Sequence, residues 1–204
     1  MHPPSAAQAY DVLAERWQDH AFNAQNGIDQ HRRALSFLDR QPGAWALNVG
    51  CGCNTRLNPL LRAHGLQIEG LDVSARMIAL ARAADPAVLL HHADICDWPI
   101  PRAYRFITAW DSIWHVLLHE QEACMRKLMG ALEDGGVLVF SAGGLDAPNE
   151  HVDAGMGQPV YYATLGIPRL LALVAEAGCV CRHLEFDQQP EKHLYLVVQR
   201  VAAP

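Results

Sequence analysis

The fold of this chain is decided by the stretch Trp45-Ala46-Leu47-Asn48-Val49-Gly50-Cys51-Gly52-Cys53-Asn54-Thr55-Arg56-Leu57. It begins as a short apolar run, which predicts a buried strand, then breaks at Gly50 and enters a helical pattern near Thr55. A strand, a glycine bend and a helix N-terminus bring unpaired backbone N–H groups to one point above a sheet. Gly50 and Gly52 have no Cβ, and Asn54 tolerates a left-handed conformation, so a ligand can lie almost against the main chain. A plain strand–helix connection is the alternative interpretation.

Two acidic residues follow at the ends of the next predicted strands. Residues 67–71 predict a second strand, and Asp72 stands at its carboxyl end, where an acid can accept hydrogen bonds from both hydroxyls of a ribose. Asp94 comes just past a third strand. Asp72 could instead begin a helix and Asp94 could cap a turn, but their joint placement favours a nucleoside site.

Four segments occur in the order and spacing of a known family. They are Asn48-Val49-Gly50-Cys51-Gly52, then Gly70-Leu71-Asp72-Val73-Ser74 with Met77 behind it, then Ala93-Asp94-Ile95, then Leu132-Glu133-Asp134-Gly135-Gly136-Val137-Leu138. Together they resemble the ordered motifs of class I S-adenosylmethionine-dependent methyltransferases, of the small-molecule type. The resemblance covers nearly the whole chain, and four motifs in order are far more specific than any one of them.

The alternation of strands and helices predicts an α/β fold with right-handed crossovers and a parallel sheet. We expect strands near residues 45–49, 67–71, 87–91, 105–110, 136–140, 180–186 and 194–199. We expect helices near residues 5–20, 29–38, 55–64, 74–84, 119–132 and 167–177. The last two strands are joined by a connection too short for a helical crossover, so they should pair antiparallel. The resemblance implies the same picture: a single doubly wound, mostly parallel seven-stranded sheet (Rossmann-like), with an antiparallel C-terminal hairpin strand and N-terminal capping helices.

The resemblance also implies one methyltransferase domain over residues 1–204. Residues 1–40 would form an N-terminal helical cap, residues 45–140 the cofactor-binding half, and residues 141–204 an acceptor loop with the C-terminal hairpin.

For the cofactor S-adenosylmethionine and its product S-adenosylhomocysteine, the resemblance implies a role for each motif. The glycine bend allows close approach, Asp72 holds the ribose, Asp94 holds the adenine amino group, and Tyr10 reaches the cofactor carboxylate. The cofactor-binding residues that it assigns are Tyr10, Asn48, Gly50, Cys51, Gly52, Asn54, Asp72, Val73, Met77, Asp94, Ile95 and Trp110. Asn48 replaces the acid usual in the family and Asn54 replaces a third glycine. A neutral Asn48 would bind the cofactor's ammonium group more weakly than a carboxylate.

A dinucleotide site is the nearest rival for the glycine bend. It requires Gly-x-Gly-x-x-Gly, and Thr55 stands at the third glycine position. The sequence contains nothing that resembles a hydride-transfer pair. An NAD-dependent oxidoreductase therefore stays a remote alternative.

The segment after the fourth strand should lie at the ligand-binding edge of the sheet. If this segment is helical, Asp111, His115 and His119 share one face. We expect Asp111 and His115 to be the catalytic residues and His119 to be solvated or structural; a metal site of these three is an alternative, and no metal is expected. With an ordinary pKa near 6.5, His115 could act as a general base.

Residues 143–162 show no periodicity and predict a long loop. This loop could form a lid and acceptor wall, and a plain surface loop is the alternative. The expected substrate-binding residues are Trp114, His151, Tyr161 and Tyr162.

Composition limits the class of partner. The 204 residues carry a net charge of −6, which disfavours nucleic acid as a partner. No apolar run approaches the ~18 residues of a membrane span, and the first residues do not resemble a signal peptide. The six cysteines lack the spacing of zinc sites and indicate reduced thiols, so we expect a cytoplasmic protein, monomeric or homodimeric, without a membrane partner.

The sequence therefore predicts an enzyme that transfers a methyl group from S-adenosylmethionine to an oxygen or nitrogen of a small molecule. Two alternatives remain: a methyltransferase that acts on a protein or nucleic acid, and a non-catalytic module that binds S-adenosylmethionine.

Overall fold

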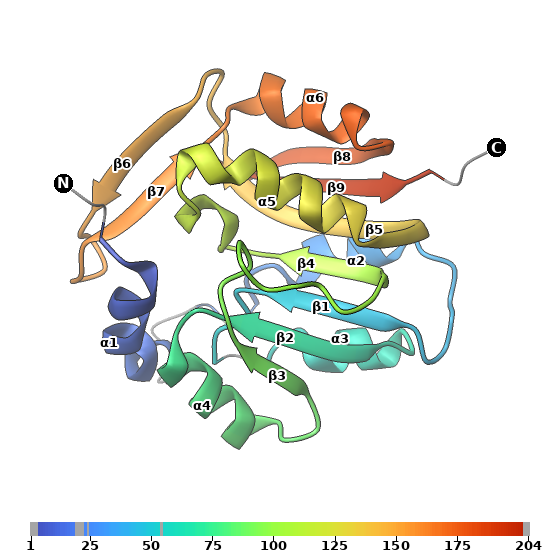
Figure 1. Cartoon of the computed structure of the whole chain (residues 1–204), viewed down its shortest axis with the longest axis horizontal. Helices are drawn as coiled ribbons and strands as arrows, with labels where there is room; N and C mark the ends of the chain where they lie inside the picture. The colour runs from blue at the N-terminus through green and yellow to red at the C-terminus, as the bar shows by residue number, and fades with distance from the viewer. Residues whose placement is uncertain (1–3, 19–22, 24, 54, 202–204) are drawn as a thin grey trace.

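The computed structural model describes residues 4–18, 23, 25–53 and 55–201, and a seven-stranded sheet forms its centre. The strand order is β3-β2-β1-β4-β5-β9-β8, and the first five strands in that order are parallel. The strands are β1 (Trp45–Val49), β2 (Gln67–Asp72), β3 (Leu89–His92), β4 (Tyr104–Ala109), β5 (Leu132–Gly143), β8 (Cys179–Gln188) and β9 (His193–Arg200). The predicted α/β fold with a mostly parallel sheet is confirmed (Figure 1).

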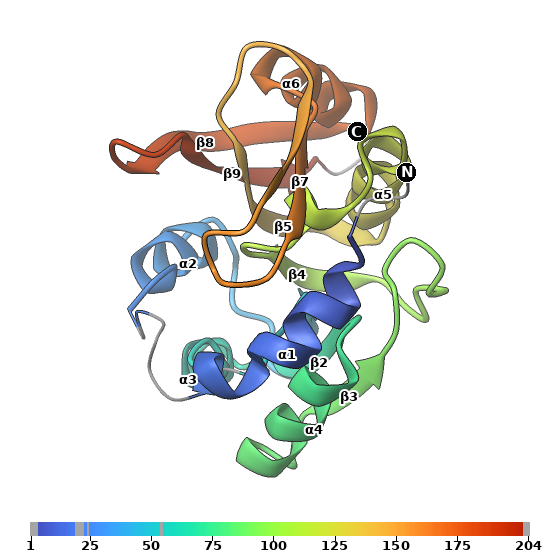
Figure 2. The ribbon, with the colours of Figure 1, turned by 90° about the vertical axis from the view of Figure 1, so that its left-hand side faces the viewer.

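Helices cover both faces of this sheet (Figure 2). On one face lie α2 (Ile28–Leu35) and α3 (Asn58–Ala63), and on the other lie α5 (Leu118–Gly130) and α6 (Ile167–Glu176). The side chains of β1 alternate between the two: Leu47 and Val49 join the core beneath α5 and α6, while Ala46 joins the core beneath α2 and α3. A strand buried on both faces reads as a continuous apolar run, which is why β1 could be recognised in the sequence.

Two further helices flank the ends of the sheet. α4 (Ala75–Ala84) packs beside β2 and β3, and α1 (Ala6–Gln18) crosses the edge at which the parallel strands end (Figure 1). The predicted helices are present, although the one expected over residues 55–64 is confined to α3. Within the described part of the chain, no helix is both long and apolar enough to cross a lipid bilayer.

The C-terminal hairpin is antiparallel, as predicted. β9 pairs with β8 and also with β5, where Gly143 lies opposite His193. Since β9 runs against its parallel neighbour, its first residue lies where β5 ends. His193 is thereby brought to the ligand-binding edge of the sheet.

The predicted loop over residues 143–162 is corrected by the structure. It contains a two-stranded antiparallel hairpin of β6 (Asn149–Asp153) and β7 (Val160–Thr164). β7 is largely buried, whereas every residue of β6 is exposed. β6 carries no apolar pattern because neither face is buried, so its pairing with β7, not its own side chains, makes it a strand.

The predicted helical face of Asp111, His115 and His119 is also wrong. Asp111 has a positive φ of 52°, a 3₁₀ turn (η1) covers Ile113–His115, and α5 begins only at Leu118. A left-handed residue cannot continue a helix, so the regular spacing of these three side chains does not place them on a common face.

Candidate active site

A cavity of about 850 Å³ opens at the carboxyl edge of the parallel strands. Its walls come from α1, from the ends of β1, β2 and β4, from η1 and from both hairpins, β6–β7 and β8–β9. Figure 2 shows this edge with α1 and β7 toward the viewer. Such a volume is within the range of pockets that bind cofactors and small ligands.

The glycine bend forms the floor of the cavity. Gly50 and Gly52 have φ values of 66° and 57°, which non-glycine residues rarely adopt. A Cβ at Gly50 would lie 2.4 Å from the Cβ of Ser112, whose hydroxyl donates to the Val49 carbonyl at 3.0 Å. The bend is therefore held by the segment after β4, and its backbone is bare toward the cavity.

Asp72 lies directly against this bend. Its Oδ2 accepts a hydrogen bond from the Gly52 N–H at 2.8 Å, and its Oδ1 accepts one from the Ser74 N–H at 2.9 Å. Burial raises the pKa of Asp72, and these two N–H groups partly oppose the shift. The hydroxyl of Ser74 accepts from Met77 N–H and caps α4, so Asp72 is not the helix cap. Each Asp72 oxygen keeps a lone pair for a ligand hydroxyl.

The third crossover adds Asp94 and Ile95 to the cavity wall, where Val73 and Met77 also lie. Asp94 accepts from the Cys96 N–H at 2.8 Å, so it does cap a turn, and it faces the cavity as well. Three neighbouring crossovers thus converge on one space, as the first three sequence motifs predict.

The His115 ring is hydrogen-bonded to three groups of the protein, two donors and one acceptor. Its Nδ1 donates to the Tyr161 carbonyl at 2.8 Å, which leaves Nε2 as the acceptor nitrogen. The Tyr10 hydroxyl and the Trp114 indole N–H both donate to Nε2, at 2.8 Å and 3.0 Å. Burial lowers the pKa of His115 to about 4, so the ring is neutral.

One lone pair of Nε2 therefore faces two donors. This arrangement favours a positioning role for His115, which holds the Tyr10 hydroxyl, over the predicted role of general base. Burial also raises the pKa of Tyr10 far above its ordinary value, with the charges of nearby acids adding to the effect. Tyr10 thus stays a hydroxyl, and it lines the cavity.

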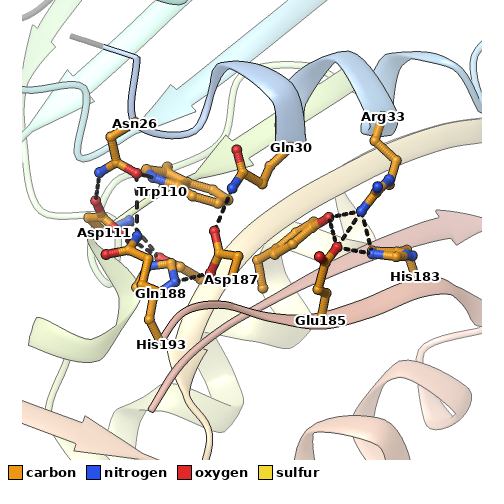
Figure 3. A network of polar contacts seen from close by, with 12 residues as sticks. Asn26, Gln30, Arg33, Trp110, Asp111, His183, Glu185, Asp187, Gln188 and His193 are labelled. Atoms are coloured by element: carbon orange, nitrogen blue, oxygen red, sulfur yellow. Dashed lines mark hydrogen bonds and ion pairs between the residues drawn. The ribbon is translucent and has the colours of Figure 1, made fainter. Parts of the chain in front are cut away.

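Asp111 stands at the end of β4 in its left-handed conformation, and its side chain is held on both sides. Oδ1 accepts from His193 Nε2 at 2.9 Å and from the Ser141 hydroxyl at 3.2 Å, and Oδ2 accepts from Asn26 Nδ2 at 2.9 Å. The Asn26 Oδ1 accepts weakly from Trp110 and Gln188, each at 3.4 Å, which fixes the direction of the amide (Figure 3).

His193 bridges two carboxylates. Nε2 donates to Asp111 and Nδ1 donates to Asp187, whose other oxygen accepts from Gln30 Nε2 on α2 at 2.6 Å (Figure 3). Burial alone would lower the pKa of His193, but its bonds to Asp111 and Asp187 outweigh burial and raise the pKa to about 9. His193 is therefore an imidazolium at neutral pH, and both nitrogens donate.

Aromatic side chains complete the wall opposite the glycine bend. His151 and Tyr162 of the β6–β7 hairpin stack with their ring centroids 5.4 Å apart, and Tyr162 also contacts Trp114. Trp110 packs against His193. The four of these residues that the sequence predicted all line the cavity: Trp110, Trp114, His151 and Tyr162.

Two predicted site residues lie elsewhere, and one is not described. Asn48 is buried and lines a separate cavity of about 20 Å³, because alternation along β1 turns its side chain away from Leu47 and Val49. Tyr161 is also absent from the cavity wall: its hydroxyl donates to Glu150 and accepts from the Leu118 N–H. Asn54 lies outside the described residues.

Sequence reasoning missed seven polar residues that line the cavity. They are Asn26, Arg56, Glu120, Asp153, Gln188, Glu191 and His193. No local motif marks them, since they come from loops and from the ends of helices and strands scattered along the chain. One signal was present for His193: an antiparallel last strand must begin at the edge where the parallel strands end.

Comparison with known proteins agrees with this geometry. Residues 46–136 match the family model described as a methyltransferase domain. A dTDP-3-amino-3,6-dideoxy-alpha-D-glucopyranose N,N-dimethyltransferase from Streptomyces fradiae is 34% identical over 120 residues, which cover 55% of this chain and 47% of that protein. A trans-aconitate 2-methyltransferase from Acidovorax sp. (strain JS42) is 36% identical over 108 residues, 52% of this chain and 41% of that protein. The chain spans about half the length of the curated relatives it matches.

Solved structures share the fold. An amino pentose methyltransferase from Micromonospora echinaspora, solved with S-adenosylmethionine bound, has a TM-score of 0.70 and 19% identity, and the alignment covers 98% of this chain and 100% of that one. The ordered motifs, the family-model match and this shared fold agree on one assignment. Residues 46–136 match a methyltransferase domain, and the chain has the fold of S-adenosylmethionine-dependent methyltransferases.

Proposed function

We propose that this protein transfers a methyl group from S-adenosylmethionine to a small-molecule acceptor. The observation that carries the proposal is a bare glycine bend with Asp72 beside it, opening into a cavity that continues past Asp111 and an aromatic wall. When bound, the cofactor supplies an activated methyl group on a sulfonium, and the chain has to hold and orient both reactants.

The residues present fit such a cofactor. Gly50 and Gly52 offer no side chain between backbone and ligand, Asp72 keeps lone pairs for ribose hydroxyls, and Asp94 is free on one oxygen to accept from an adenine amino group. Tyr10, on α1, lines the same cavity, and its hydroxyl is held by His115. Asn48 is left out of this assignment because it does not reach the cavity.

The chain contributes mainly by positioning the reactants and excluding water. α1 and the β6–β7 hairpin both close over the cavity, and Arg16 of α1 donates to the Met156 carbonyl of the hairpin turn at 2.8 Å. Holding two reactants in line can supply several kcal/mol of the acceleration without a base. A cavity of about 850 Å³ under two such elements suits a small acceptor better than a macromolecular one.

The other expectations belong to the same proposal. Residues 1–204 form one domain, with a helical cap at 1–40, a cofactor half at 45–140 and an acceptor part at 141–204. The net charge of −6 supports a protein without a nucleic-acid partner. We place it in the cytoplasm as a monomer or homodimer, in keeping with its six free thiols.

Calorimetry with S-adenosylhomocysteine and with NAD tests the proposal. We expect the first compound to bind and the second not to bind. The Asp72→Ala variant should weaken binding of S-adenosylhomocysteine by about 1.5–3 kcal/mol, the range for lost hydrogen bonds to a charged group. The matched control is Asp29→Asn on α2, an aspartate whose side chain is 88% exposed. Binding of NAD alone, or unchanged affinity in Asp72→Ala, would contradict the assignment.

A further inference from the structure

The charges that line the cavity are mostly negative. Among the described residues, six carboxylates face it, and the cationic groups there are Arg56 and the His193 imidazolium. The carboxylates are Asp72, Asp94, Asp111, Glu120, Asp153 and Glu191. The first two belong to the proposed cofactor site, so the rest of the cavity still carries an excess of negative charge.

We propose, building on the function above, that the acceptor is an amine bound as its ammonium cation and that Asp111 is the residue that selects it. The ammonium gives up one proton to solvent before its nitrogen lone pair takes the methyl group, and S-adenosylhomocysteine is the leaving group. The relatives compared above are named for acceptors as different as an amino sugar and a tricarboxylate, so family membership does not decide between them. The side chains that line the cavity of this protein decide which acceptor fits.

Asp111 has one acceptor position left for a ligand. Its Oδ1 already accepts from His193 and Ser141, while Oδ2 accepts from Asn26 alone. A carboxylate oxygen can accept two hydrogen bonds, so Oδ2 has room for one more donor. The Asp111 side chain is 24% exposed, whereas those of His193 and Asp187 behind it are 6% and 5% exposed. The open position therefore faces the cavity.

The surroundings of Asp111 favour a cation over an anion at that position. Asp111, His193 and Asp187 together carry one net negative charge, and two of the three are closed off from solvent. The guanidinium of Arg56, whose Nε donates to the Asn26 carbonyl at 2.8 Å, lies near Asp111 and offsets that charge. Asp153 and Glu191 keep the cavity around Asp111 negative. An acceptor carboxylate would meet Asp111, Asp153 and Glu191 in the same space and be repelled.

The aromatic wall adds to this preference. Trp110, Trp114 and Tyr162 line the cavity beside Asp111, and aromatic faces attract an ammonium group. Their apolar surface also suits the carbon skeleton of a small amine. The same wall would not attract the highly hydrated carboxylates of a tricarboxylic acid.

The test is a binding competition that does not require the natural acceptor. The protein, saturated with S-adenosylhomocysteine, is titrated at pH 7.5 with three probes of similar shape: 2-phenylethylammonium, 2-phenylethanol and 3-phenylpropanoate. The NMR signals of the Trp110 and Trp114 indole N–H groups, assigned with Trp→Phe variants, report binding in the cavity. We expect the cation to bind about 10- to 100-fold more tightly than the alcohol, and the anion to bind most weakly.

Two variants connect the preference to its residues. Asp111→Asn keeps the shape and should make cation and alcohol bind about equally, with unchanged affinity for S-adenosylhomocysteine. Glu191→Gln, at an exposed position on the rim, cannot disturb folding and should lower the preference about two- to threefold. Asp29→Asn is again the matched control and should leave the preference intact.

The outcomes separate this inference from the proposed function. Equal or tighter binding of the alcohol or the anion, a cation preference that survives in Asp111→Asn, or no indole shift with the cation up to its solubility limit would each overturn the amine proposal alone. Failure of the wild-type protein to bind S-adenosylhomocysteine would overturn the proposed function and the amine proposal with it.

Discussion

His115 and His193 both pack against the Trp114 ring, with centroids 6.1 Å and 5.4 Å from it, and both have each ring nitrogen hydrogen-bonded. Burial on its own would lower the pKa of both. Yet His115 is neutral, because it meets a carbonyl and two donors, and His193 is charged, because it meets two carboxylates. The partners of a buried histidine, more than its depth, therefore decide its charge and what it can do.

The largest effect should follow from removing the charged member of the pair. His193→Ala leaves Asp111 and Asp187 buried without their common cation, which should lower the free energy of unfolding by about 3–5 kcal/mol. Urea denaturation measures it. His151→Ala, at an exposed position on the cavity wall, is the control and should cost far less. A His193→Ala protein as stable as the control would mean that the two carboxylates do not depend on this histidine.

The next effect distinguishes the two histidines by pH. The pKa of His193 is raised from 6.5 to about 9, so the stability it contributes is complete below pH 6.5 and is lost as the pH rises through 9, by about 3 kcal/mol. The pKa of His115 is lowered to about 4, so its contribution is present above pH 6.5 and is lost as the pH falls through 4. Buried His31, with a pKa also near 4, adds to this acid loss.

The free energy of unfolding, measured at several pH values, should therefore be highest between the two pKa values and fall on both sides. His193→Gln should reduce the fall at alkaline pH and leave the fall at acid pH unchanged. A fall at alkaline pH that is unchanged in this variant would show that His193 is not charged in the folded protein.

The smallest effect tests the neutral member of the pair. Tyr10→Phe removes one of the two donors to His115 Nε2 but leaves Trp114 as its partner, so stability should fall by only about 1 kcal/mol. His115 should then titrate at a higher pH, because less hydrogen bonding favours its neutral form. NMR titration of the His115 ring measures this shift. A fall in its pKa would contradict the assigned tautomer, in which Nδ1 carries the proton and Nε2 accepts.

The two halves of the cavity also differ in how far the sequence predicts them. Gly50, Gly52 and Asp72 lie in short strand–bend–helix segments, where local backbone geometry demands particular residues, so the half that we propose for the cofactor could be recognised from motifs. The fold could be predicted for the same reason, because a strand that is buried on both faces appears in the sequence as an apolar run. Asn48 is the exception, because the motif does not show to which face of the sheet β1 turns its side chain.

The half that we propose for the acceptor contains no such local segment. Asn26, Asp111 and His193 meet through a loop, a left-handed residue and the start of the last strand, and none of these contacts is local in sequence. The spacing of Asp111 and His115 suggested a shared helical face, but the positive φ of Asp111 could not be foreseen without the fold. β6 was missed because an exposed strand has no hydrophobic period.

The left-handed backbone at position 111 also narrows the range of substitutions open to evolution. Glycine, asparagine and aspartate are the residues that tolerate such a φ most readily. Of these three, aspartate alone brings a negative charge. A relative that took asparagine there would keep the main-chain path, yet would lose the electrostatic bias of its pocket. If Asp111 selects the acceptor as we propose, a single nucleotide replacement would shift the substrate range without any remodelling of the scaffold.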